Sequence, residues 1–291
     1  MNGYMFTSVD LRKLIVPLFL EQFLAILVGL ADTFVISFVG EAAVSGVSLV
    51  NSFNTIFIYL FTALAAGGAV IVSQYIGRKK EELAGESVTQ LLMISTLFSI
   101  VITIVVFFFG DVLMCLLFGG VESDVMDAGM VYLRISALSY PALAVYNAGA
   151  ALYRSIGKTS VTMYIAVISN IINVIGNIVC VFAFRMGVAG VAYPSFIARA
   201  FSAVAVTVLC RRKENGVYYR IRWFFCWNHE LLKRILGIAV PNGIEQGIFQ
   251  FVKVALSSIV ALFGTYQIAA NGIAQSIWSL AALVCVTMGP V

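Results

Sequence analysis

Eight long apolar segments restrict the fold of this sequence more than any other feature. They cover Leu14–Val39, Ser52–Tyr75, Val88–Phe109, Met130–Tyr153, Val161–Phe184, Val188–Cys210, Ile235–Phe263 and Ile268–Val291. Each is long enough to cross about 30 Å of hydrocarbon at a helical rise of about 1.5 Å per residue. The runs are nearly continuous rather than alternating, which argues against a transmembrane β-barrel. The sequence therefore predicts an all-α, polytopic membrane helix bundle.

Composition excludes the other broad classes of protein. Of the 291 residues, 61% are hydrophobic and only 11% are charged, and the mean hydropathy is +1.00. Soluble domains have about 45–50% apolar and about 25% charged residues. Water cannot solvate so apolar a surface, which excludes a soluble domain, a disordered chain and a fibre. The expected surroundings are a lipid bilayer, and no nucleic-acid partner is expected.

Lysine and arginine residues sort the loops by side of the membrane. Of the 18 such residues, fourteen lie at the N-terminus, in the two other loops on that side, or in the linker 211–234. Arg185 alone lies in a loop on the opposite side. The positive-inside rule therefore places the N-terminus and the linker in the cytoplasm of a multi-pass cell-membrane protein. The acidic loop after Phe109, with Asp111 and Asp124, is expected to face outward.

Cysteine and histidine offer no metal site. The five cysteines do not cluster, and four lie in or beside apolar runs, so free thiols are expected. His229 is the single histidine and cannot build a metal site alone.

The chain repeats itself after 224 residues. Pro17-Leu-Phe-Leu-Glu21-Gln22 recurs as Pro241-Asn-Gly-Ile-Glu245-Gln246, and Gly40 falls on Gly264 at the same offset. Six expected spans separate the copies, so both enter the membrane from the same side and form a parallel repeat. The second copy stops at Val291, inside its second helix, and we therefore expect the chain to be a fragment.

Several motifs resemble the multidrug and toxic compound extrusion (MATE) transporters. Residues 67–80, which include Gln74 and Gly77, look like the signature that ends the family's second helix, and residues 187–192 resemble the turn into its sixth. The family has two lobes of six helices each. The resemblance thus implies a six-helix N-terminal lobe (1–210), a cytoplasmic linker (211–234) and the first two helices of a truncated second lobe (235–291).

Asp32 is the only aspartate inside an expected span. A charge there costs roughly 3 kcal/mol or more, so the carboxylate should face the bundle interior or a water-filled cavity. It could be held there for structure alone, but ionisable groups in membrane spans are functional by default. In the family that the chain resembles, an aspartate at this position is the site of proton or sodium coupling.

Asn173 and Asn177 are four residues apart and so share one helix face, which should point inward. Interhelical hydrogen bonding is the structural alternative to ion binding. Counted along the spans, Asp32, Asn177 and Ser195 fall in the outer half of the bilayer. The resemblance implies that Asp32, Asn173, Asn177 and Ser195 surround a proton or cation site.

The coupling ion stays open between H⁺ and Na⁺. Some members of the family have an aspartate where Asn177 stands, so one carboxylate is missing here. Na⁺ is possible at Asp32, Asn173 and Asn177, whose side chains offer oxygen ligands. Burial disfavours the charged carboxylate, so protonation of Asp32 is the simplest mechanism, and neutral Asp32 could let the first helix shift or bend. No other cofactor is expected.

Four further polar residues are candidates for the substrate cavity: Lys253, Arg199, Gln22 and Gln246. Arg199 is expected to pair with Asp32 or with Glu21, and Lys253 either lines the central cleft or pairs with Glu245. Pro17 and Pro241 permit kinks, because each frees a backbone carbonyl one turn earlier. The glutamate–glutamine pairs that follow the prolines are expected to satisfy polar groups near those kinks.

The resemblance implies a secondary antiporter, not an enzyme, that exports drugs or other amphiphilic, often cationic compounds in exchange for H⁺ or Na⁺. A lipid-linked oligosaccharide flippase of the same superfamily is the alternative transporter, and it would need basic residues in its cavity. The sequence has three mid-span cations, Arg134, Arg199 and Lys253. A non-transporting scaffold is the third alternative. An intramembrane aspartyl protease would need a second aspartate beside Asp32.

Overall fold

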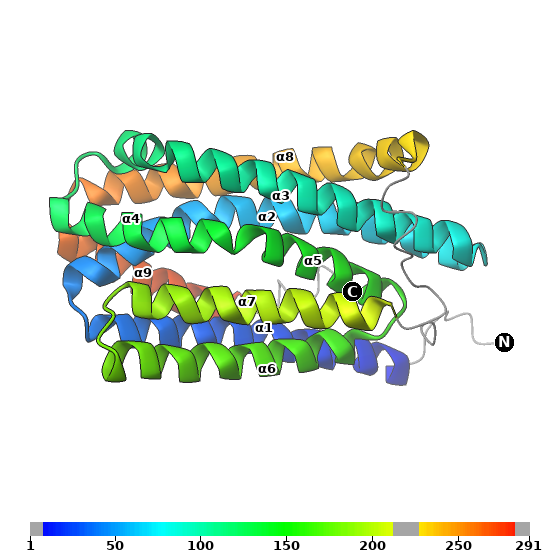
Figure 1. Cartoon of the computed structure of the whole chain (residues 1–291), viewed down its shortest axis with the longest axis horizontal. Helices are drawn as coiled ribbons and strands as arrows, with labels where there is room; N and C mark the ends of the chain where they lie inside the picture. Colours follow the sequence, from blue (N-terminus) through cyan, green and yellow to red (C-terminus); the bar gives the residue numbers. More distant parts are fainter. Residues whose placement is uncertain (1–7, 212–226, 283–291) are drawn as a thin grey trace.

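The computed structural model describes residues 8–211 and 227–282, and these ranges form a bundle of long helices without strands (Figure 1). The helices are α1 (Ser8–Ser37), α2 (Glu41–Gly77), α3 (Glu81–Phe118), α4 (Ser123–Leu138), α5 (Tyr140–Ser155), α6 (Thr159–Ile178), the π-helical turn η1 (Val179–Ala183), α7 (Ala189–Cys210), α8 (His229–Ala261) and α9 (Thr265–Ala281). The predicted all-α membrane bundle is confirmed.

Six of the described helices are long and apolar enough to cross a membrane, and the bent pair α4–α5 brings the number to seven. The eighth expected span corresponds to α9, which is described only as far as Ala281. Part of the linker, 212–226, and the last residues, 283–291, lie outside the described residues. Helix α8 begins at His229, so its first turns fall in the range assigned to the linker. The sidedness of the loops and the lobe boundaries stay predictions.

The expected span Met130–Tyr153 is not one straight helix. It divides at Ser139 into α4 and α5, which are bent by 47°. Pro141 causes the break, because it has no N–H and cannot bond to the carbonyl of Ala137 one turn earlier. The Oγ1 of Thr103 in α3 lies 3.2 Å from that carbonyl and shares its one proton between it and the Ser99 carbonyl of α3, at 2.8 Å. A hydroxyl on a neighbouring helix thus satisfies the backbone where the proline interrupts it.

The third expected span is also longer than its apolar run. Helix α3 continues from Phe109 to Phe118, and α4 already begins at Ser123, so Asp111 and Asp124 are helical rather than part of an open acidic loop. Asp111 accepts from Arg134 of α4 at 3.3 Å, with both side chains exposed. Helix α3 can carry the charge of Asp111 because this side chain is exposed near the end of the helix.

Pro17 lies inside α1 and frees the carbonyl of Lys13. Glu21 accepts hydrogen bonds from three polar side chains near this kink, as expected of the Glu21–Gln22 pair, but in the described structure neither residue bonds to the Lys13 carbonyl. Thr159, at the start of α6, points its Oγ1 toward the Lys13 and Leu14 carbonyls at 3.3 and 3.4 Å. As at Pro141, a threonine hydroxyl from a neighbouring helix therefore contacts the carbonyl that the proline frees. In α8, Pro241 likewise lies inside the helix.

The internal repeat is reproduced in the helix ends. Helices α1 and α8 end at Ser37 and Ala261, and α2 and α9 begin at Glu41 and Thr265, so both pairs of boundaries are 224 residues apart. The turns between them hold Gly40 and Gly264, with φ of 141° and 114°. Such angles favour glycine. Helices α1 and α8 also run in the same direction (Figure 1), as a parallel repeat requires.

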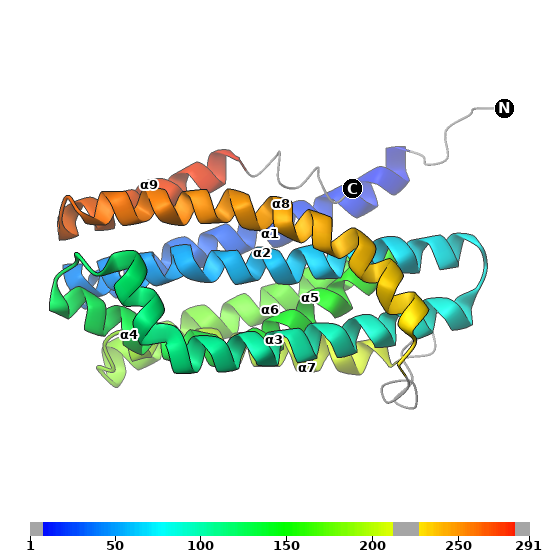
Figure 2. The ribbon, with the colours of Figure 1, turned by 90° about the horizontal axis from the view of Figure 1, so that it is seen from above.

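Small residues let the helices approach closely around α2, which lies in the middle of the bundle between α1 and α3 (Figure 2). A side chain at Gly67 would meet the backbone of Ala239 in α8, and one at Gly68 would meet Leu91 in α3. Beside this contact, a cavity of about 420 Å³ lies between α2, α3 and α8, with apolar side chains such as Leu64, Phe98 and Ile244 lining it. Gly67 and Gly68 thus permit the close approach of α2 to α8 and α3.

Gly46 provides a test of this packing. A Cβ at this position of α2 would lie 2.6 Å from the carbonyl oxygen of Val125 and 2.8 Å from the amide nitrogen of Gly129, both backbone atoms of α4. We expect Gly46→Val to lower the free energy of unfolding by about 2 kcal/mol, because α2 and α4 must separate. Thermal unfolding of the detergent-purified protein measures this loss. Gly29→Ala is the control, since nothing lies within 4 Å of a Cβ there, and an equal loss in both variants would contradict the packing.

Candidate functional site

Three helices bring Asp32, Asn173, Asn177 and Ser195 together. Asn177 Nδ2 in α6 donates to Asp32 Oδ1 in α1 and, at 3.1 Å, to Asn173 Oδ1. Asn173 Nδ2 in turn donates to Ser195 Oγ in α7 at 2.8 Å. The four predicted residues thus form one chain of hydrogen bonds, which we call the Asp32 chain.

Helix geometry explains why these side chains meet. The spacing of four residues places both asparagines on one face of α6, where they are buried against α1 and α7. Between them, Gly176 lets α7 approach, because a Cβ there would lie 2.7 Å from Cβ of Pro194. Ser195 follows Pro194 directly, so the close approach carries its hydroxyl to Asn173.

The Asp32 chain lies near the C-terminal ends of α1 and α6. Asp32 is five residues before the end of α1, and Asn177 is next to the end of α6. The helix there continues as the π-helical turn Val179–Ala183. Single π-helical turns within helices occur frequently at functional sites. The hydrogen bonds place these side chains at one level of the bundle, and their predicted position in the outer half of the bilayer stays a prediction.

One oxygen of the site has no partner among the described residues. Asn177 is fully buried, and its Oδ1 has no hydrogen bond there, although its Nδ2 makes two. A buried carbonyl oxygen without a donor is unfavourable, because its desolvation is not compensated. Next to a carboxylate, such an oxygen can accept a bond from a protonated group or contact a cation. The site therefore holds unused capacity for positive charge.

Oxygen atoms suit the hard cation Na⁺ in this place. Carboxylate and amide oxygens come from Asp32, Asn173 and Asn177, which supply one negative charge in total. The described parts of the chain contain no group of three or more His, Cys, Asp or Glu side chains that could hold a metal ion, and Asp32 is the one such residue in the Asp32 chain. The described cysteines, Cys115, Cys180 and Cys210, are free thiols; Cys226 and Cys285 lie outside the described residues.

Arg199 pairs with neither carboxylate, so that prediction is wrong. Its Nη1 donates to Ser139 Oγ at 2.6 Å, at the break between α4 and α5. Glu21 is already bonded to Arg154 at 3.0 Å. Sequence reasoning missed Ser139, although the nearby Pro141 marked a possible helix end. Arg199 thus lies one turn from Ser195 without forming an ion pair in the described part of the protein.

The other cavity candidates do not join the Asp32 chain. Lys253 is exposed on α8, where its Nζ lies 5.0 Å from the centre of the Phe249 ring, and it forms no ion pair with Glu245 in the described structure. Phe249 lies between the two along the helix, so the lysine contacts the ring instead. Gln22 is half-buried ten residues before Asp32, about 15 Å along α1. Gln246 is half-buried on α8.

Ser195→Ala tests the Asp32 chain. The substitution leaves Asn173 Nδ2 without its acceptor, and we expect it to lower the free energy of unfolding by about 1–3 kcal/mol. Ser279→Ala is the matched control, because both serines donate to a carbonyl one turn earlier but Ser279 is exposed on α9. Thermal unfolding in detergent compares the two. Equal stability of Ser195→Ala and wild type would show that the hydrogen bond between Asn173 and Ser195 contributes nothing.

Curated relatives match most of the chain. An "Uncharacterized transporter YisQ" of Bacillus subtilis (strain 168) is 28% identical over 266 residues, which cover 90% of this chain and 58% of the relative. A "Probable multidrug resistance protein NorM" of Thermotoga maritima is 24% identical over 281 residues, or 93% of this chain and 58% of the relative. The chain thus spans somewhat more than half the length of these relatives.

Solved structures share the fold. A "MOP superfamily transporter from Pyrococcus furiosus" superposes with a TM-score of 0.86 at 21% identity, over 97% of this chain and 62% of that one. A "multidrug resistance MATE family transporter" in an outward-facing conformation gives a TM-score of 0.85 at 20% identity, with the same coverage. The family model described as MatE matches residues 17–179, more than half of the sequence. This chain therefore belongs to the MatE family.

Proposed function

We propose that the protein is a secondary antiporter in the cell membrane. It exports drugs or other amphiphilic, often cationic compounds in exchange for H⁺ or Na⁺ by alternating access. The names of the relatives support export of drugs, since they include a "Probable multidrug resistance protein" and a "Multidrug export protein". The N-terminus and the linker 211–234 are assigned to the cytoplasm on the distribution of lysine and arginine.

The observation that carries this proposal is the Asp32 chain with its unpartnered oxygen. A carboxylate inside a membrane span is unfavourable unless it is neutralised, and Asp32 lies where α1, α6 and α7 meet. When a cation arrives, the negative charge that holds Asn177 Nδ2 is neutralised. The hydrogen bond between α1 and α6 then weakens, and the packing of α1 can change. Ion binding is thereby linked to helix position, as an antiporter requires.

Either ion could use the site. A protonated Asp32 becomes a donor, and Asn177 Oδ1 is a buried acceptor without a partner in the described structure. Na⁺ needs several oxygen ligands, which Asp32 and the two asparagines supply. The single carboxylate gives a net charge of zero with one bound H⁺ or one Na⁺, so the proposed stoichiometry at this site is one ion.

The mid-span cations favour an antiporter over a flippase. Recognition of a pyrophosphate would require several basic groups to converge. Arg134 instead pairs with Asp111, Arg199 bonds to Ser139, and Lys253 lies on a different helix over Phe249. Each has its own neighbour, and no shared basic pocket results from these three residues.

Proteoliposome transport of a cationic dye tests the proposal. Under an imposed pH gradient or Na⁺ gradient, we expect Asp32→Asn to reduce gradient-driven export by about tenfold or more, equivalent to about 1.4 kcal/mol of lost ion binding. The gradient that drives wild-type export identifies the ion. Asp111→Asn is the control, because this aspartate pairs with Arg134 on an exposed surface.

Unchanged gradient-driven export by Asp32→Asn would refute the assigned role of this carboxylate. If the wild-type protein moves no dye but translocates a lipid-linked oligosaccharide, the flippase alternative replaces the antiporter. Transport of neither would favour the non-transporting scaffold.

A further inference from the structure

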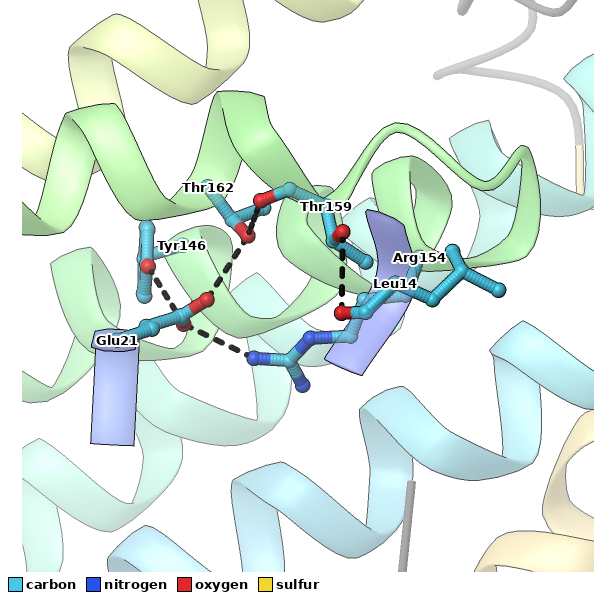
Figure 3. A network of polar contacts seen from close by, with 6 residues as sticks. All are labelled: Leu14, Glu21, Tyr146, Arg154, Thr159 and Thr162. Carbon is cyan, nitrogen blue, oxygen red and sulfur yellow. Dashed lines mark hydrogen bonds and ion pairs between the residues drawn. The ribbon is translucent and has the colours of Figure 1, made fainter. Parts of the chain in front are cut away.

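Helix α1 carries a second buried carboxylate, which the proposed ion exchange does not use. Glu21 lies eleven residues before Asp32, which is about three turns along the same face of the helix. Its side chain is 8% exposed. Glu21 Oε1 accepts from Arg154 Nη2 at 3.0 Å and from Tyr146 OH at 3.2 Å, and Oε2 accepts from Thr162 Oγ1 at 2.8 Å (Figure 3). Both oxygens are therefore occupied.

A second contact lies about two turns away on α1. Thr159 Oγ1 is directed at the Leu14 carbonyl (Figure 3) and at the Lys13 carbonyl, which Pro17 frees. Thr159 and Thr162 are one turn apart on α6, and Thr162 Oγ1 also donates to the Thr159 carbonyl at 2.9 Å. The carboxylate and the interrupted backbone of α1 are thus bound by the same turn of α6.

The partners of α1 lie on two helices that a short turn connects. Helix α5 ends at Ser155 and α6 begins at Thr159, and the turn between them holds Gly157 with φ of 73°. Ser155 Oγ donates to the carbonyls of Ala151 and, in α2, Ala69, which fixes the end of α5 against the centre of the bundle. The α5–α6 hairpin therefore offers α1 a firm anchor.

We propose that Glu21 and Arg154 are positioning residues that hold the N-terminal half of α1 on the α5–α6 hairpin throughout transport. We call the contacts of Glu21 with Arg154, Tyr146 and Thr162, together with those of Thr159, the α1 clasp. Opening it would leave a buried charge without its counter-ion, which is strongly unfavourable. Asp32, by contrast, is half-buried. Movement that follows ion binding is therefore confined to the part of α1 beyond Glu21.

Hydrogen exchange tests the clasp without any transport. We expect Glu21→Gln to raise amide exchange in residues 12–20 by about tenfold, because the charged partner of Arg154 is lost. Exchange at the other end of α1, in residues 33–37, should stay unchanged. Glu230→Gln is the matched control, since Glu230 pairs with Arg234 on an exposed surface of α8, and it should alter exchange in neither segment.

A double variant separates a clasp from a general loss of stability. Glu21→Gln with Arg154→Gln removes both charges, so no buried charge stays uncompensated, and exchange in residues 12–20 should return toward the wild-type value. Additive effects of the two substitutions, or exchange that rises along the whole helix, would contradict the α1 clasp.

Cross-linking tests whether the clasp stays closed, and this part rests on the proposed antiport. In a protein whose native cysteines are replaced, Leu14→Cys with Thr159→Cys places thiols across the second contact and leaves Glu21 intact. We expect oxidation to form a disulfide and to leave dye export within about twofold of the reduced protein. Failure to cross-link, or export that stops and returns with reductant, would overturn the proposal. Absence of export in the reduced protein would refute the antiport alone, because hydrogen exchange reports on the clasp independently.

Discussion

A backbone carbonyl within the hydrocarbon must find its donor inside the protein, and the structure around α1 and α5 depends on this constraint. Pro17 and Pro141 each remove a helical donor one turn after a carbonyl. Thr159 and Thr103 supply the replacement from a neighbouring helix. The same hydrogen bonds therefore repair an interrupted helix and attach it to the next one. Such contacts fix the register between two helices. Apolar packing alone specifies this register poorly in a membrane, because lipid tails are as apolar as the side chains.

Arg199 joins the bend at Ser139 to the surroundings of the proposed ion site. Its Nη1 donates to the Ser139 hydroxyl at 2.6 Å, and it forms no ion pair with Asp32 in the described structure. Asp32 accepts instead from the amide of Asn177, a neutral partner. In the proposed exchange, this amide contact would give way to a proton or a metal ion, whereas a full ion pair would hold the charge of Asp32 permanently. The break between α4 and α5 and the proposed ion chemistry would thus be connected through Arg199.

Hydropathy and spacing predicted much of this arrangement. The apolar runs predicted the helices, and the 224-residue offset predicted the matching ends of α1 and α8. The i,i+4 spacing predicted that Asn173 and Asn177 share one inward-facing side of α6, and the family resemblance implied that they lie beside Asp32. The bend at Ser139 escaped prediction because the apolar run crosses it without interruption. The hydrogen-bond partners of Arg199 and Glu21 also escaped prediction. They depend on how helices distant in sequence pack against one another, and hydropathy periodicity describes only one helix at a time. For Lys253 the sequence left two alternatives, the central cleft and a pair with Glu245, and neither included the Phe249 ring that its Nζ contacts one turn away.

The contact between Gly67 and Ala239 joins the two copies of the repeat through a hydrogen atom and a methyl group. Side chains of this size project little from the helix surface, so the steric barrier to sliding of α2 along α8 is low at this contact. A leucine or phenylalanine in either place would interlock with side chains of the opposite helix and oppose such sliding. Low steric resistance at this contact, rather than strong attraction, is what a bundle with two conformations would require.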